Sequence, residues 1–236
     1  MANYSYLAVV DYETTGKNAQ KCQPMSMACT IIDPVRLEIL SQGDFYSLIK
    51  CSWDKDWCDA NNTEVPQEEA LAITKLTRED NEKAPSWQEV HTRFEAHIKK
   101  FYTGTGQWKA PLFAGFNSDS YDYTIMSRAC EKWGSWDKVY QKQGLFHPIH
   151  SVDAMKIMWL MTEARKGWFS LSLDTIRKNF GLKGGQTHNA LADCRDTAAL
   201  LIKTMKWFRQ ASKSVKLEGC FEGIDIFDFY DTRPTE

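Results

Sequence analysis

The chain has 236 residues, of which 43% are hydrophobic and 25% are charged, and its formal net charge is −2. This length and composition predict a globular protein with one large domain, and no apolar run approaches the roughly 20 residues that span a bilayer. The charge excludes a protein that coats nucleic acid through a broad basic surface. It leaves open an enzyme site at which bound cations supply local positive charge.

A cytoplasmic location is the default expectation, because neither a bilayer-spanning run nor a secretory leader is visible. The N-terminus leads into an apolar strand without a basic-then-apolar leader. The chain also has an odd number of cysteines, seven, and they lack the paired spacing of zinc ligands. We therefore expect reduced cysteines with structural roles.

The first fifty residues predict a meander of three strands, at about 6–11, 26–32 and 44–50. Turn residues at 33–34 and 42–43 separate these strands. Residues 51–66 are polar and predict an irregular segment.

Helical periodicity begins with the segment 86–101, where Ser86 and Glu89 form a capping box ahead of an apolar stripe. A buried strand follows at 111–115. Further helices are predicted at about 120–132, 153–164, 172–180 and 189–209, and Gly181 is a suitable stop for the third of these.

The predicted order begins with three strands and continues with several helices that enclose one further strand. This order predicts an α/β fold with a mixed sheet flanked by helices. We expect a single domain over residues 1–210, with residues 211–236 as a C-terminal tail or strap.

Asp11 and Glu13 follow the apolar run 7–10 directly. Side chains two residues apart in a strand point to the same face, so these two carboxylates should project together. Clustered carboxylates need a positive partner, and hard divalent cations such as Mg²⁺ or Mn²⁺ prefer oxygen ligands.

Two further acidic motifs follow. The strand at 112–115 leads through Phe116 and Asn117 to Asp122, at the start of a helix. Far downstream, the segment 188–193 opens another helix with His188 and Asp193.

These motifs resemble the DEDDh family of 3′→5′ exonucleases, with Asp-x-Glu at 11–13, Gly-Phe-Asn leading to Tyr-Asp at 115–122, and His-x4-Asp at 188–193. The segments 151–155 and 171–176 support the resemblance, which runs from about residue 5 to residue 205. It implies a ribonuclease H-like fold with a five-stranded mixed sheet, and the motif spacing is similar to the exonuclease I branch.

The resemblance also implies how the site works. Two Mg²⁺ or Mn²⁺ ions would be held by the four carboxylates, with Asp11 as the bridging ligand, Glu13 and Asp193 completing one ion's shell, and Asp122 completing the other's. His188 would be the general base, because an ordinary histidine titrates near neutral pH. The glycine-rich segment 181–187 before it could bring it to the substrate.

Other acids compete for these roles. Asp196 lies one helical turn after Asp193, and Asp119 precedes Asp122 by three residues, but the family spacing favours Asp193 and Asp122. Asp153 resembles an acid that lies beside the family's site, and we expect it to orient neighbouring groups.

Substrate contacts are expected from Thr14 and Thr15, from Asn117, and from Lys183. Tryptophans in predicted loops could stack on unpaired bases; they are Trp53, Trp57, Trp108 and Trp168.

The motifs together predict a 3′→5′ exonuclease that acts on the 3′ end of single-stranded DNA and releases nucleoside 5′-monophosphates. RNA trimming is an alternative, and so is a catalytically silent nucleic-acid-binding module. The acidic and aromatic segment 223–231 could pack on the domain or dock on a replication partner. We expect no membrane partner, and the sequence carries no signal for an oligomeric state.

Overall fold

A computed structural model describes residues 5–163, 170–182 and 189–214. The chain divides into two compact units, Met1–Ile202 and Lys203–Glu236. The division falls within a helix, eight residues before the boundary at 210–211 that the sequence suggested. Most of the predicted tail lies outside the described residues.

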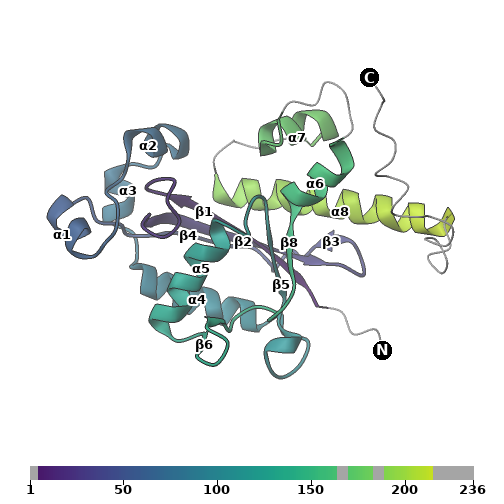
Figure 1. Cartoon of the computed structure of the whole chain (residues 1–236), viewed down its shortest axis with the longest axis horizontal. Coiled ribbons are helices and arrows are strands. Elements are labelled where there is room, and N and C mark those ends of the chain that lie inside the picture. Colours follow the sequence, from purple (N-terminus) through teal and green to yellow (C-terminus); the bar gives the residue numbers. More distant parts are fainter. Residues whose placement is uncertain (1–4, 164–169, 183–188, 215–236) are drawn as a thin grey trace, which may run out of the picture. The chain divides into compact units, whose positions relative to one another are not determined.

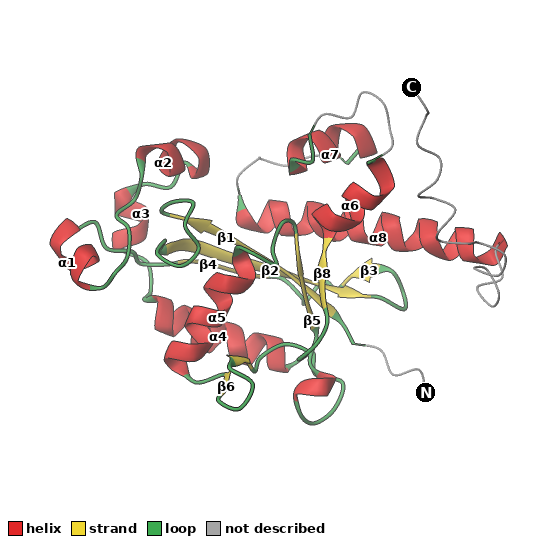
Figure 2. Cartoon of the chain, in the orientation of Figure 1, coloured by secondary structure: helices red, strands yellow, loops and turns green. Residues whose placement is uncertain are grey.

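A mixed sheet forms the centre of the first unit, and the described residues contribute six strands to it (Figures 1 and 2). The order is β3-β2-β1-β5-β8, and β4 also pairs with β2. β1 pairs with β2 antiparallel and with β5 parallel, and β5 pairs with β8 parallel. The bounds are Leu7–Thr14 (β1), Pro24–Asp33 (β2), Glu38–Ile39 (β3), Phe45–Leu48 (β4), Leu112–Gly115 (β5) and Ser151–Asp153 (β8). The predicted mixed sheet is confirmed, with six strands rather than five.

The two faces of β1 have different neighbours. Ala8, Val10 and Tyr12 belong to the core cluster that includes residues of α4 (Trp87–Lys99) and α5 (Asp122–Trp133). Because side chains alternate along a strand, Asp11 and Glu13 point to the opposite face. α7 (Leu173–Phe180) and the start of α8 (Ala190–Ser214) lie on that side (Figure 1).

The helix α4 forms as its sequence predicts. Ser86 accepts a hydrogen bond from the Glu89 backbone, and the Glu89 carboxylate caps the Ser86 backbone in return. Val90, Phe94 and Ile98 are fully buried on one side of the helix. Burying each such side chain contributes roughly 1.5–3 kcal/mol, which fixes α4 against the sheet.

The helices α6 (Ala154–Thr162), α7 and α8 begin close to their predicted starts, but α8 runs to Ser214, five residues beyond its predicted end at 209. Ser172 caps the first turn of α7, and Gly181 ends it in the left-handed conformation with φ of 60°. Asn189 accepts a hydrogen bond from the Ala192 N–H at the start of α8. α6 lies within the segment predicted at 153–164.

Several short elements were not predicted. The segment 51–66 contains α1 (Lys55–Ala60), which Asp54 caps, so it is more regular than its composition suggested. The remaining elements of this kind are the strands β3 and β8, α2 (Glu68–Thr74), α3 (Arg78–Glu82), the 3₁₀-helix η1 (Gln107–Lys109), and the hairpin β6 (Trp136–Asp137) and β7 (Lys142–Gln143).

Within the described residues, every helix is too short or too polar to cross a bilayer. The cysteines among them are all buried and have free thiols, as expected for reduced structural residues.

In the second unit, the structure describes residues 203–214, which continue α8. Trp207 and Phe208 pack edge to face with ring centroids 5.0 Å apart.

Candidate active site

Three carboxylates meet at the edge of the sheet where β1 ends. One ligand atom each from Asp11, Glu13 and Asp193 lies within 4.8 Å of the other two. Asp11 and Glu13 share a face of β1, and Asp193 comes from the first turn of α8. The strand and the helix thus bring together acids that are about 180 residues apart in the sequence.

Asp122, the first residue of α5, reaches the same edge through the backbone of β1. Its Oδ1 accepts a hydrogen bond of 3.1 Å from the N–H of Tyr12, the residue between Asp11 and Glu13. The Asp122 side chain is buried, and its negative charge acts directly on Asp11.

A cavity of about 230 Å³ opens between these acids. It is lined by the four acids together with Tyr12, Phe116, Asn117 and Tyr121. All four proposed metal ligands therefore border one cavity, into which a phosphate could enter.

Burial makes this cluster hard to ionise. Desolvation is the largest cause of the rise in the pKa of Asp11 well above its usual range. The charges of Asp122, Glu13 and Asp193 raise this pKa further. Burial, followed by the Asp193 charge, raises the pKa of Glu13 to about 7. Burial also raises the pKa of Asp122 to about 8, although the Tyr12 N–H opposes the shift.

These residues fit hard divalent cations. The donor set consists of oxygen atoms and carries up to four negative charges, and because Asp122 is buried and the other three are partly buried, these charges need a nearby positive partner. Mg²⁺ and Mn²⁺ match this chemistry better than thiolate-seeking metals.

The loop after β5 is shaped so that Asp122 can reach the acids. A Cβ on Gly115 would lie 2.4 Å from the Ser118 Cβ and 3.1 Å from the Val10 carbonyl, so only glycine fits where β5 passes β1. Asn117 follows with φ of 57°, a left-handed conformation that asparagine tolerates.

Asp153 holds this loop from the neighbouring strand. Its carboxylate accepts hydrogen bonds from the N–H groups of Asn117 (3.0 Å), Asp119 (3.4 Å) and Met155 (2.9 Å). It therefore orients backbone groups beside the acids, as the sequence indicated.

The family model described as RNase T exonuclease matches residues 8–201, which is most of the chain. The chain belongs to this exonuclease family. The resemblance to DEDDh 3′→5′ exonucleases is thereby confirmed. Comparison with curated protein sequences gives no match.

Solved structures of nucleases share the fold of this RNase T family member. Cell-death related nuclease 4 has 16% sequence identity and a TM-score of 0.63, over 87% of this chain and 65% of that one. Exonuclease I of E. coli, in complex with a dT13 oligonucleotide, has 20% identity and a TM-score of 0.61, over 88% of this chain and 43% of that one. A 3′-exonuclease described by its 3′-end specific recognition of a histone mRNA stem-loop has 12% identity and a TM-score of 0.60, over 87% and 84%. The chain thus spans less than half the length of exonuclease I.

Tyr121 forms part of the wall of the acidic cavity and joins the end of β1 to α5. Its hydroxyl donates to the Gly16 carbonyl at 2.5 Å and lies 2.5 Å from the Thr14 hydroxyl. Thr14 also donates to the Gly16 carbonyl, at 2.9 Å. These contacts hold residues 14–16, next to Glu13, in one conformation.

The next threonine is engaged inside the protein. Thr15 is fully buried, and its hydroxyl accepts from the Gln23 N–H at 2.9 Å and donates to the Glu64 carbonyl at 3.3 Å. Its backbone N–H and carbonyl pair with Gln23 and Gln67. The substrate contact through Thr15 stays a prediction; within the structure its hydroxyl and backbone groups have protein partners.

The competing acids point elsewhere. Asp119 accepts from Ser151 at 3.0 Å and pairs with Lys156 at 2.6 Å. Asp196 pairs with Arg177 at 2.7 Å. Neither belongs to the close group of three carboxylates that the described residues form.

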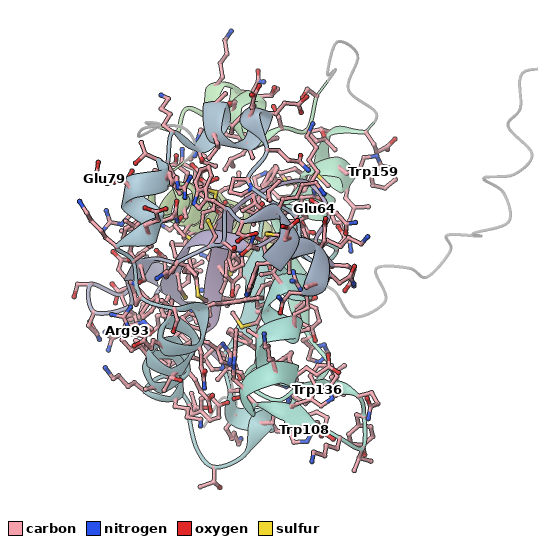
Figure 3. All side chains as sticks on the ribbon, turned by 90° about the vertical axis from the view of Figure 1, so that its left-hand side faces the viewer. Glu64, Glu79, Arg93, Trp108, Trp136 and Trp159 are labelled. Atoms are coloured by element: carbon pink, nitrogen blue, oxygen red, sulfur yellow. The ribbon has the colours of Figure 1, made fainter. Side chains whose placement is uncertain are left out.

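His188 and Lys183 lie outside the described residues, as does Trp168. Among the other tryptophans, Trp53 carries the Arg78 guanidinium over its ring at 5.8 Å, and Trp57 is half exposed on α1. Figure 3 shows Trp108 well below Glu64, whose carbonyl contacts Thr15. Trp108 is therefore poorly placed to stack on a base near the acids.

Sequence reasoning assigned no role to Arg177 or to the Tyr121 hydroxyl. A helical arginine usually lies on a solvated face, and only Asp174, three residues earlier on the same helix, hinted at an ion pair.

Proposed function

We propose that this chain is a divalent-metal-dependent 3′→5′ exonuclease that removes nucleoside 5′-monophosphates from the 3′ end of single-stranded DNA. The observation that carries the proposal is the convergence of Asp11, Glu13 and Asp193 within 4.8 Å, beside a buried Asp122. Membership of the exonuclease family supports the same reaction.

In this proposal, Asp11, Glu13 and Asp193 would hold one cation, and Asp122 would help to hold a second with Asp11. Such ions would supply stabilisation of the charge that develops on the phosphate oxygens and on the leaving 3′ oxygen. The protein's part is to hold the four carboxylates in place at the edge of one cavity, so that the scissile phosphate enters a prepared site.

His188 is proposed to accept the proton of the attacking water. This step rests on the sequence motif, because the residue lies outside the described part of the chain. Replacement by glutamine should lower the single-turnover rate by ~10²–10⁴-fold, the usual contribution of a general base. His150→Gln is the matched control, because this exposed histidine lies on a loop far from the acids in the sequence.

DNA is favoured over RNA because exonuclease I structures are solved with dT13 and dA16 oligonucleotides and have 20% and 19% identity to this chain. The 3′-exonuclease related to histone mRNA has 12% identity and supports RNA as the second candidate. Thr14 and Asn117 border cavities at the acidic edge. They are proposed to contact the terminal nucleotide, together with Thr15 and with Lys183, which lies five residues before His188.

The test uses 5′-labelled DNA and RNA oligonucleotides of the same sequence, with Mg²⁺, Mn²⁺ or a chelator. The proposal expects a ladder that shortens one nucleotide at a time, faster on DNA, and that disappears with chelator or in Asp122→Asn. Asp119→Asn is the matched control and should stay active. Binding without shortening would instead support the silent module, and faster shortening of RNA would support trimming.

Two remaining proposals rest on sequence alone. A cytoplasmic location can be checked by fractionation of cells. Docking of the acidic segment within 211–236 on a replication partner predicts that deleting residues 222–236 removes partner binding but leaves exonuclease activity intact. Loss of solubility would show that the segment packs on the domain.

A further inference from the structure

Arg177 is a buried residue of α7 that contacts the acidic cluster, with only 7% of its side chain exposed. Each nitrogen of its guanidinium contacts a different carboxylate. One donates to Asp174 at 2.8 Å, one to Asp196 at 2.7 Å, and the third to Oδ1 of Asp193. The arginine is therefore placed by three acids at once.

One of those acids belongs to the candidate cation site. Asp193 is the only partner of Arg177 that is also in the close group with Asp11 and Glu13 among the described residues. The positive charge of Arg177 also acts on Asp11, where it opposes the rise in pKa. Arg177 thus contacts the site through Asp193 and is not among the residues that line its cavity.

The geometry suits orientation better than simple neutralisation. A guanidinium is a planar fork whose N–H groups point in fixed directions, so three simultaneous contacts restrict its rotation. A carboxylate held by such a fork has a fixed orientation as well. Side chains that hold metal ligands in this way typically change metal affinity ~10–100-fold when they are replaced.

We propose that Arg177 is a positioning residue for the cation site: it holds the Asp193 carboxylate toward Asp11 and Glu13. The inference rests on the proposed function, because it takes Asp193 as a ligand. It adds Arg177, a residue of α7 that lies just after the segment 171–176 and outside the family motifs.

A competing explanation is that Arg177 only ties α7 to α8. The chain offers variants that separate the two roles. Asp196→Asn weakens the tie between the helices but leaves the contact with Asp193. Asp174→Asn removes a partner that is half exposed and lies on the same helix as Arg177.

The primary experiment measures Mn²⁺ binding to the full chain without nucleic acid, by electron paramagnetic resonance of the free ion. Arg177→Met should raise the Mn²⁺ dissociation constant ~10–100-fold. Arg177→Lys, which keeps the charge but loses the fork, should give a smaller rise. Asp174→Asn and Asp196→Asn should stay within about twofold of the parent.

Kinetics give a second readout. With Arg177→Met or Arg177→Lys, kcat should fall at low Mg²⁺ and recover as Mg²⁺ is raised, while KM for the oligonucleotide changes little. A purely structural tie would not produce a loss that cations reverse.

Unchanged or tighter Mn²⁺ binding in a folded Arg177→Met protein would overturn the inference. If Arg177 acted only through its positive charge, it would repel the cation, and its removal would tighten binding. If Arg177→Met does not fold, Arg177→Lys decides: Mn²⁺ binding equal to that of the parent overturns the proposal.

Asp11→Asn distinguishes failure of the Arg177 proposal from failure of the proposed cation site. If that change leaves Mn²⁺ binding intact, the proposed site itself is wrong; if it abolishes binding, the site stands and Arg177 is tested separately.

Discussion

The backbone N–H of Tyr12 donates to Asp122 Oδ1 at 3.1 Å, which joins the strand that carries two of the acids to the helix that carries another. The hydrogen bond stabilises the charged form of Asp122 at a position where burial opposes it. The site is therefore assembled against an electrostatic cost, and that cost can be measured.

The first prediction separates activity from stability at Asp11. Asp11→Asn should lower the exonuclease rate about 10³-fold, since a cation site supplies several kcal/mol of charge stabilisation. The same change should raise the melting temperature of the metal-free protein at pH 8, because desolvation and the charges of neighbouring acids disfavour the ionised form of Asp11, and asparagine cannot ionise. Calorimetry and oligonucleotide degradation measure the two effects.

Asp33→Asn is the matched control for that experiment. Asp33 is buried, and its Oδ1 accepts from the N–H groups of Val35 and Arg36 at 2.8 Å and 3.1 Å. This change should lower the melting temperature and leave the rate intact. A fall in melting temperature for Asp11→Asn as well would contradict the assigned electrostatics.

The second prediction concerns pH. The folded protein raises the pKa of Glu13 from 4.5 to about 7 and that of Asp122 from 3.8 to about 8. At a pH between the usual and the raised pKa of each group, the folded state binds more protons than the unfolded chain. The free energy of unfolding therefore falls as pH rises through this range. The Glu13 shift alone corresponds to about 3 kcal/mol.

Denaturant titrations in the presence of chelator should therefore show the contribution of these groups decreasing from about pH 5 to pH 8. Mg²⁺ should restore stability mainly at pH 8, where the carboxylates are ionised and can bind it. Equal stabilisation by Mg²⁺ at pH 5 and pH 8 would argue against cation binding by this cluster.

The third prediction tests the Tyr121 hydroxyl. Tyr121→Phe removes the contacts with Gly16 and Thr14 and should lower the free energy of unfolding by about 1 kcal/mol. KM should rise about fivefold with little change in kcat, because the loop next to Glu13 loosens. Stopped-flow kinetics on short oligonucleotides measure both constants.

Tyr123→Phe, on the same helix, is the control, since the Tyr123 hydroxyl accepts only a long hydrogen bond of 3.4 Å from Gln143 among the bonds described for it. It should leave KM unchanged. A large fall in kcat for Tyr121→Phe at constant KM would place this hydroxyl in the chemical step instead.

The fourth prediction separates the backbone of Asn117 from its side chain. Glycine adopts the left-handed conformation freely, so Asn117→Gly should preserve stability, whereas Asn117→Val should lower it by about 1–2 kcal/mol. If the asparagine side chain contacts the terminal nucleotide, Asn117→Gly will still raise KM. An unchanged KM in this variant would remove Asn117 from the binding site.

Much of the architecture could be predicted where a local signal is strong. Period-two alternation in β1 predicted that Asp11 and Glu13 share a face, and the Ser86–Glu89 capping box predicted the start of α4. Gly181 predicted the end of α7. Each of these features depends on only a few neighbouring residues.

Other features depend on tertiary contacts and were missed. β8 has three residues, too few for a periodic pattern, and it forms because it pairs with β5. The role of Arg177 depends on two helices that bring Asp193 and Asp196 to one guanidinium. The buried hydroxyl of Thr15 could not be distinguished by sequence from the neighbouring Thr14.

The hydrogen bond between Tyr12 and Asp122 joins residues 110 positions apart, and Asp193 arrives another 71 residues later. Such long loops must close before the acids can meet, and that closure is slow compared with local helix formation. During synthesis, the growing polypeptide should therefore be unable to cut nucleic acid on the ribosome until α8 has emerged from the exit tunnel.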